Sequence, residues 1–277
     1  MASMGCKQRM MSSPSHETAS LRPPRFLTLR TVIALMLREM GSTYGRSPGG
    51  YFWAIAQPIG MIMVLALAFG LLFRSPSLGT SFILFYSTGF LPFDLYNQLQ
   101  SKISSSLIYS RAMLAYPRVT WLDTILARFV LNTITLLTVF CIVITGILLV
   151  VDTHTIISIT PILLGLSMAA ALGLGVGLMN CLLGGLFPVW DILWRIIMRP
   201  MFMASGVLFI FEDMPRFVQT ILWWNPVFHV TGLMRMGFYQ TYSADYISLR
   251  YGFGVAFVLM AAGLLFLRAN YQRVLEK

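Results

Sequence analysis

The sequence lacks a phosphate-binding loop and contains very little lysine. No Gly-x-x-x-x-Gly-Lys-Ser/Thr pattern occurs in its 277 residues, and lysine is found only at Lys7, Lys102 and Lys277. In that pattern, backbone N–H groups and a lysine hold nucleotide phosphates. The chain therefore has no recognisable ATPase motor, and we expect it to bind no cofactor of its own. Uphill transport by such a chain must draw on an ion gradient or on a second protein.

Residues that could bind a metal or perform catalysis are also scarce. The three histidines are scattered, at His16, His154 and His229. No His-x-x-x-His or Cys-x-x-Cys spacing occurs, so we predict no metal centre and no catalytic residue. Cys141 and Cys181 fall in apolar stretches and are expected to be packed thiols. Cys6 follows no apolar stretch, which argues against a lipoprotein signal. A membrane-embedded enzyme that uses a Ser–His pair is the less favoured alternative.

Charged residues are few and apolar residues are abundant. The chain is 57% hydrophobic and 11% charged, whereas soluble domains are about one quarter charged. The net charge of +10 could suggest nucleic-acid binding, but the basic residues flank apolar segments instead of forming a patch. We therefore predict a membrane protein with no nucleic-acid partner. Its helices would use nearly the whole chain, which leaves no room for a second soluble domain.

Six apolar segments are long enough to cross a bilayer, which requires about 20 residues. They cover approximately residues 53–73, 81–100, 124–151, 162–183, 191–211 and 251–267. The predicted fold class is an all-α polytopic membrane protein with six transmembrane helices. Residues 26–277 would form one transmembrane domain, and the polar residues 1–25 would form a disordered cytoplasmic tail.

Two other segments are apolar but too short to cross. In residues 26–40, apolar side chains recur at three- and four-residue steps, while Arg30 and Arg38 lie on another side. This pattern predicts an amphipathic helix in the membrane interface, although packing on other helices is an alternative. Residues 212–250 contain two apolar pieces divided by Asn225-Pro226. We predict a re-entrant pair of half-helices there, since such backbone is tolerated where protein or a cavity covers it.

The basic residues are distributed unevenly between the two sides of these six spans. One side receives 4 of the 20 lysines and arginines, namely Arg74, Arg216, Arg235 and Arg250. The other side receives the remaining 16. Because positive residues accumulate on the cytoplasmic side, both termini are predicted to be cytoplasmic and residues 212–250 external.

Two features within the predicted spans are unusual. Asp94 is a carboxylate near the middle of the second span. Ionisable residues in spans usually face a cavity or pair with another group, so Asp94 could line a path or pair with Arg128. Gly173 and Gly177 have the Gly-x-x-x-Gly spacing that lets two helices approach closely. We interpret these glycines as packing positions.

Aromatic residues cluster at the predicted membrane edges. Tyr51 and Trp53 lie near the inner edge, and Trp223, Trp224 and Tyr239 lie near the outer one. Such clusters are typical of an interfacial belt. The alternative is a surface on which sugar rings stack.

The predicted cytoplasmic loop 101–121 is unusually apolar. Its apolar residues are spaced for one side of a short helix that ends before Pro117, since proline cannot continue a helix. A soluble partner could bind such a helix. The alternative is a turn that lies on the lipid surface.

Taken in order, these parts resemble the permease of type-2 ABC exporters, most closely permeases that export capsular polysaccharide. The resemblance covers all but about residues 1–25. It is carried by Leu37-Arg38-Glu39, Thr88-Gly89-Phe90-Leu91-Pro92-Phe93, Tyr116-Pro117-Arg118-Val119, Arg199-Pro200, Ser205-Gly206 and Trp224-Asn225-Pro226. Asp94 departs from it, because an apolar or aromatic residue is expected there.

The resemblance implies a bacterial inner-membrane protein in which two copies pair around a central path. Two separate ATPase subunits, which bind ATP and Mg²⁺, would dock on the cytoplasmic side. A lipid-linked polysaccharide would pass outward to a periplasmic adaptor and an outer-membrane channel. Another lipid-linked glycan, such as O-antigen or teichoic acid, or a drug or small lipid, is the alternative cargo.

Two sets of site residues follow from these arguments. The predicted ATPase-coupling residues are Arg38, Glu39, Leu107, Tyr109, Arg111, Leu114 and Tyr116. The predicted substrate-path residues are Tyr51, Trp53, Phe93, Asp94, Trp223, Trp224, His229 and Tyr239.

Overall fold

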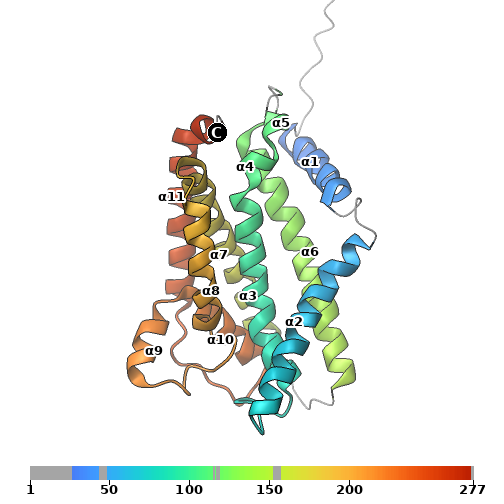
Figure 1. Ribbon diagram of the computed structural model, residues 1–277, viewed down its shortest axis with the longest axis vertical. Helices are drawn as coiled ribbons and strands as arrows, with labels where there is room; N and C mark the ends of the chain where they lie inside the picture. The colour runs from blue at the N-terminus through green and yellow to red at the C-terminus, as the bar shows by residue number, and fades with distance from the viewer. Residues whose placement is uncertain (1–26, 44–48, 115, 117–118, 152–156, 276–277) are drawn as a thin grey trace, which may run out of the picture.

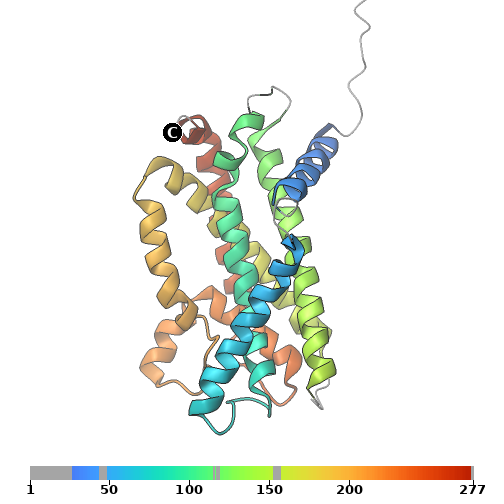
Figure 2. The same cartoon turned by 45° about the vertical axis from the view of Figure 1, so that its right-hand side comes forward.

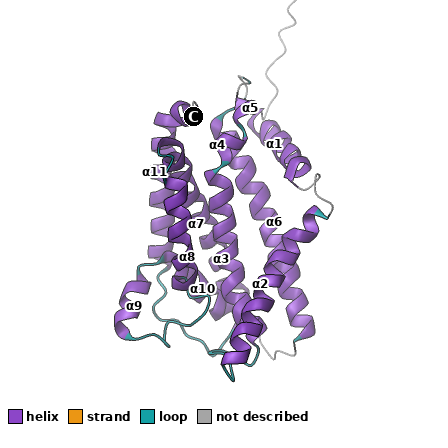
Figure 3. Cartoon of the chain, in the orientation of Figure 1, coloured by secondary structure: helices purple, strands orange, loops and turns teal. Residues whose placement is uncertain are grey.

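The computed structural model describes residues 27–43, 49–114, 116, 119–151 and 157–275, and every regular element in these ranges is an α-helix (Figure 3). The helices are α1 (Leu27–Thr43), α2 (Gly50–Leu72), α3 (Phe82–Ser104), α4 (Ser106–Tyr109), α5 (Arg111–Leu114), α6 (Trp121–Val150), α7 (Ile159–Leu186), α8 (Trp190–Ala204), α9 (Arg216–Trp223), α10 (Pro226–Phe238) and α11 (Leu249–Leu275). The prediction of an all-α fold is confirmed. The predicted tail, residues 1–25, lies outside the described residues.

Helix α7 forms the centre of the bundle, where it packs against α3, α10 and α11. Helices α1, α4 and α5 and the end of α11 lie at one end of the molecule, which we call the α4 end (Figure 1). Helices α9 and α10 and the turn between α2 and α3 lie at the opposite end, the α9 end (Figure 1). The segments predicted to share a side of the membrane thus lie at the same end of the bundle.

Glycines allow α7 to approach two neighbours closely. A Cβ atom at Gly177 would lie 2.7 Å from Cβ of Ile103 in α3. A Cβ at Gly173, one turn earlier, would lie 2.9 Å from Cβ of Leu99. On another face, a Cβ at Gly175 would lie 2.8 Å from the carbonyl oxygen of Ala256 in α11. The prediction that Gly173 and Gly177 are packing positions is confirmed.

We expect Gly177→Ala to destabilise the protein, because the new methyl group must displace α3 or Ile103. Overpacking of this kind costs about 1–3 kcal/mol. Gly146→Ala in α6 is the matched control, since a Cβ there meets no atom within 4 Å. Thermal unfolding of the detergent-solubilised protein would measure both variants. Equal midpoints for the two would contradict the tight packing of α3 on α7.

Four described helices, α2, α6, α7 and α11, are long and apolar enough to cross a membrane. Helix α3 has 23 residues but contains Asp94 and other polar side chains. The prediction of a continuous span over 191–211 is wrong, because α8 ends at Ala204 after 15 residues. At 1.5 Å per residue it covers about 22 Å, which is less than the roughly 30 Å of hydrocarbon. Gly206, with φ of 72°, turns the chain out of the helix.

The short predicted elements are found near their expected bounds. Helix α1 exposes an apolar stripe formed by Leu29, Ile33, Leu37 and Met40, as an interfacial helix would. Residues 212–250 are divided at Asn225-Pro226 into α9 and α10, and Asn225 caps α10 by accepting a hydrogen bond from the Val227 N–H. The prediction of packed thiols holds for Cys181, which is buried, but is wrong for Cys141, which is exposed on α6.

Candidate functional site

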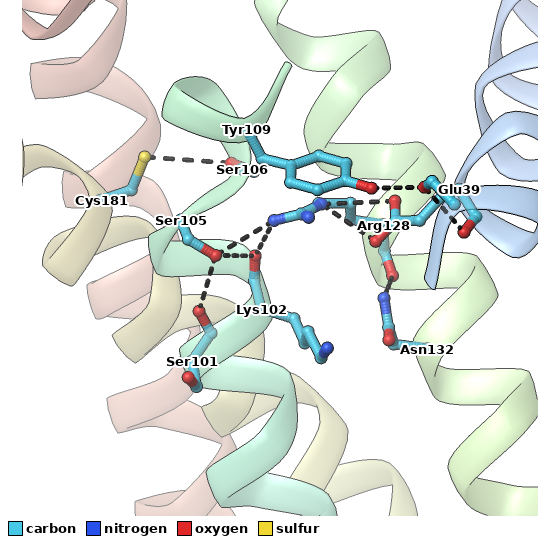
Figure 4. A network of polar contacts seen from close by, with 10 residues as sticks. Glu39, Ser101, Lys102, Ser105, Ser106, Tyr109, Arg128, Asn132 and Cys181 are labelled. Carbon is cyan, nitrogen blue, oxygen red and sulfur yellow. Dashed lines mark hydrogen bonds and ion pairs between the residues drawn. The ribbon is translucent and has the colours of Figure 1, made fainter. Parts of the chain in front are cut away.

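Arg128 of α6 is the centre of a buried polar network at the α4 end (Figure 4). The residue is 4% exposed, and its Nε lies 3.1 Å from Oε1 of Glu39, which is also buried. Glu39 belongs to α1, which lies beside α6 in Figures 1 and 2. A buried charge is costly unless it is paired, so this ion pair fixes where α1 can dock.

The same guanidinium also contacts the corner between α3 and α4. Its Nη1 donates to the carbonyl oxygen of Lys102 at 2.8 Å and to Oγ of Ser105 at 3.1 Å. The guanidinium lies 4.0 Å from the centre of the Tyr109 ring, an arrangement that favours a cation–π interaction. The Tyr109 hydroxyl in turn hydrogen-bonds Oγ of Ser42 in α1. One arginine thus joins α1, α3, α4 and α6.

The local sequence explains why Arg128 reaches this position. Thr120 and Asp123 form a capping box, in which the Thr120 Oγ1 accepts from the Asp123 N–H and the Asp123 carboxylate accepts from the Thr120 N–H. This cap fixes the start of α6. Arg128 follows within two turns, on the face that carries Asn132, whose side-chain amide donates to the Arg128 carbonyl oxygen.

The predicted ATPase-coupling residues divide into three groups in the structure. Glu39 and Tyr109 belong to the Arg128 network. Leu107 is 0% exposed and packs with residues such as Ile103 and Leu178, so we correct its assignment from a docking contact to a packing residue. The remaining four members lie at the surface. Leu114 is half-buried, and Arg38, Arg111 and Tyr116 are exposed.

Sequence reasoning missed the main role of Arg128. The residue was considered only as a partner for Asp94, and the structure shows that interpretation to be wrong. Arg128 pairs with Glu39, whereas Asp94 accepts a hydrogen bond from Nε2 of Gln98 at 2.7 Å. The partner could not be read from the sequence, since Glu39 and Arg128 are 89 positions apart.

A groove of about 710 Å³ lies between α2, α3 and α8. It brings together Trp53, Phe93 and Asp94, three of the predicted path residues. Phe202 of α8 meets Phe93 edge to face with ring centres 5.3 Å apart, and the amides Gln57 and Asn97 also line the wall. The wall therefore offers flat apolar faces next to hydrogen-bonding groups, a combination that suits sugar rings. The side chain of Tyr51, another predicted path residue, is outside the described part.

A second aromatic group lies at the α9 end. The ring of Trp223 stacks on Tyr251 with centres 5.0 Å apart, and its Nε1 donates to the carbonyl oxygen of Tyr246. Burial raises the pKa of Tyr246 to about 12. Trp224 is 66% exposed and, with Trp223 and Arg216, lines a surface pocket of about 420 Å³.

Two predicted path residues are buried away from these surfaces. Nε2 of His229 lies 2.9 Å from the carbonyl oxygen of Trp223, and its Nδ1 accepts from the Ser248 N–H at 3.3 Å. Both ring nitrogens are therefore used to join α10 to the end of α9 and to the residue just before α11. Tyr239 is buried beneath the turn at Gly79. We correct both residues from path-lining to packing positions, because a passing polymer could not touch them.

No cluster of three or more histidine, cysteine, aspartate or glutamate side chains able to hold a metal occurs among residues that the structure describes. The chemistry of the site is thus that of hydrogen bonds, aromatic faces and one buried ion pair. Long apolar helices, a polar and aromatic groove along them and a polar network at one end define a multi-pass membrane transport subunit.

Comparison with known proteins gives the family. The ABC-2 type transporter family model matches residues 30–239, and the chain belongs to this family. It is 26% identical over 245 residues to the polysialic acid transport protein KpsM of Escherichia coli, covering 88% of this chain and 95% of KpsM.

Two further relatives carry capsule-export names. The capsule polysaccharide export inner-membrane protein BexB of Haemophilus influenzae is 24% identical, over 89% of this chain and 93% of BexB. The capsule polysaccharide export inner-membrane protein CtrC of Neisseria meningitidis serogroup B is 26% identical, over 76% of this chain and 79% of CtrC. Like them, this chain is an inner-membrane transport component.

Proposed function

We propose that this chain is the permease subunit of an ATP-driven exporter that moves lipid-linked capsular polysaccharide from the cytoplasm to the periplasm. The observation that carries this proposal is the family match over residues 30–239, together with three relatives that are named for polysaccharide or polysialic acid transport. The groove supports a sugar cargo, since Trp53, Phe93 and Phe202 offer ring faces beside amide side chains.

The motor of this exporter would be a separate ATPase subunit. The sequence contains no nucleotide-binding loop, and the distribution of basic residues favours the α4 end as the cytoplasmic one. Tyr109, Leu114 and Tyr116 offer apolar surface at that end. Arg128 links such a surface to α1, α3 and α6, because it belongs to α6 and its guanidinium contacts Glu39 of α1, the Lys102 carbonyl oxygen of α3 and the Tyr109 ring.

The remaining partners follow from the same proposal. Two copies of the chain would face each other across the path, with an ATPase subunit below each copy. Helix α8 has no buried residue and exposes Ile192, Ile196 and Met203, a surface that a second copy or lipid would cover. A periplasmic adaptor and an outer-membrane channel would receive the polymer.

The test combines loss of the gene with one variant of the proposed docking surface. Deletion of the gene should remove polysaccharide from the cell surface and leave it inside the cell. We expect Leu114→Asp to fail to restore export although the protein inserts normally, since a carboxylate at a buried apolar contact weakens ATPase binding. Leu114→Met, which conserves volume, should restore export.

Surface polysaccharide, accumulated intracellular polymer and co-purification of the ATPase would be measured for each strain. A normal capsule in the deletion strain would refute capsule export as the function. A normal capsule with Leu114→Asp would refute only the docking surface.

A further inference from the structure

A second cavity, of about 680 Å³, opens beside the groove and nearer the α4 end. Gln57, Asn97 and Met198 line both spaces, so the cavity and the groove adjoin each other. The cavity differs from the groove in its chemistry. Its wall includes four amide side chains, three serine hydroxyls and two cations, Lys102 of α3 and Arg195 of α8, beside apolar residues such as Ile108 and Met198.

The cations are available to a ligand. No side chain in the described part of the molecule pairs with the Lys102 ammonium, which points away from Arg128 in Figure 4. Nε of Arg195 donates to the carbonyl oxygen of Asp191, and its two terminal nitrogens form no hydrogen bond or ion pair with the described residues. Asp191 supplies the one carboxylate of the lining, so the fixed charge of the cavity is positive.

The walls of the cavity are rigid because a chain of side-chain hydrogen bonds runs behind them. Oε1 of Gln100 accepts from Nδ2 of Asn180 and from Nε1 of Trp194, each at 3.0 Å. Oδ1 of Asn180 accepts from Nε1 of Trp190, also at 3.0 Å. These bonds hold the first turns of α8 against α3 and α7. Arg195 follows Trp194 and is therefore presented from a fixed helix.

The cavity also adjoins the Arg128 network. The carbonyl oxygen of Lys102 and the hydroxyl of Ser105 both accept from Arg128, and both residues line the cavity. A ligand held by Lys102 would thus lie directly beside the contacts that join α3, α4 and α6.

We propose that this cavity binds the phosphorylated head of the lipid-linked substrate, with Lys102 and Arg195 on the phosphate and the amides on neighbouring hydroxyl groups. A phosphate accepts several charge-assisted hydrogen bonds, and amide side chains both donate to and accept from hydroxyls. The volume suits a small-molecule ligand. It accommodates one end of a polymer, not a long stretch of it. The identity of the ligand depends on the function proposed above.

The experiment measures binding to the full chain purified with its ATPase partner, followed by tryptophan fluorescence because Trp194 lines the cavity. Three probes separate the possible ligands: dioctanoyl phosphatidic acid, dioctanoylglycerol, which lacks the phosphate, and inorganic phosphate. We expect the first to bind at least about tenfold more tightly than either of the others, since it alone combines the phosphate with a lipid anchor.

Lys102→Gln and Arg195→Gln should each raise the Kd for phosphatidic acid about tenfold, because each removes one charge-assisted contact. Lys102→Arg and Arg195→Lys keep the charge and should retain most of the affinity. Arg199→Gln is the matched control: Arg199 is exposed on the next turn of α8 and does not line the cavity.

Wild-type affinity in both glutamine variants would overturn the proposal, as would equal loss in Arg199→Gln. Equal affinity for inorganic phosphate and phosphatidic acid would assign the site to free phosphate and overturn its link to the substrate. The binding measurement does not depend on export. If phosphatidic acid does not bind, the capsule test is unaffected; if the capsule test fails, the binding measurement is still valid.

Discussion

Replacing Arg128 with methionine is expected to abolish export and to lower the thermal stability of the protein. The substitution leaves Glu39 buried without its cation and removes the donors to Lys102 and Ser105. Breaking a buried ion pair by deleting one partner costs about 3–5 kcal/mol. Helix α1 should then detach from α6, and the α3–α4 corner should lose its fixed position relative to both.

A double-mutant cycle separates stability from coupling. In Glu39→Leu/Arg128→Met neither charge remains, and apolar replacement of a buried pair is often close to neutral. We therefore expect the double variant to regain most of the stability that the single variant loses. It should still fail to export, because the contact between the Tyr109 ring and the Arg128 guanidinium of α6 is lost. Thermal midpoints and surface polysaccharide would be measured for all four proteins. Additive effects of the two substitutions would contradict a direct interaction between Glu39 and Arg128.

Replacing Arg235 with leucine should disorganise the α9 end. Arg235 is 1% exposed, and its Nη1 and Nη2 donate to the carbonyl oxygens of Phe209 and Val207 at 2.7 Å and 3.2 Å. The guanidinium also lies 4.4 Å from the centre of the Phe85 ring. No carboxylate within ion-pair distance serves it in the described residues, so these carbonyls and this ring compensate its charge. Arg235 thereby holds the non-helical stretch after α8 against α3 and α10.

Each carbonyl left buried without a donor costs about 1–3 kcal/mol, and the loss of the ring contact adds to this. We expect a large fall in the thermal midpoint of Arg235→Leu and rapid proteolysis between α8 and α9. Arg235→Lys should be intermediate, since one ammonium cannot reproduce the two-pronged contact. Arg250→Gln, an exposed arginine at the start of α11, should behave like the wild type. Normal protease resistance in Arg235→Leu would show that other contacts hold this stretch.

The patterns that depend on neighbouring residues could be read from the sequence. The apolar segments gave the helices, and Asn225-Pro226 marked the division between α9 and α10. The spacing of Gly173 and Gly177 predicted a close helix contact, which α3 supplies. The apolar character of residues 101–116 also pointed to an unusual loop, although it forms the short turns α4 and α5 instead of one helix.

The errors have a common physical cause. The residues on both sides of Gly206 are mostly apolar, so hydropathy could not locate the turn there, which Arg235 stabilises from another helix. His229, Tyr239 and Leu107 are residue types that occur both on surfaces and in cores, and only packing decided that all three are buried. Glu39 is 89 positions from Arg128, so only the placement of the helices identified it, and not Asp94, as the partner of Arg128.

By itself, the sequence determined a membrane-embedded helical protein that has no nucleotide-binding loop, because length, apolar content and missing motifs are properties of the chain alone. The tertiary structure alone decided which charges are paired, that Lys102 and Arg195 share a cavity with four amide side chains, and that Arg128 joins four helices. These are distances between residues remote in sequence, and such distances are set by how the helices pack.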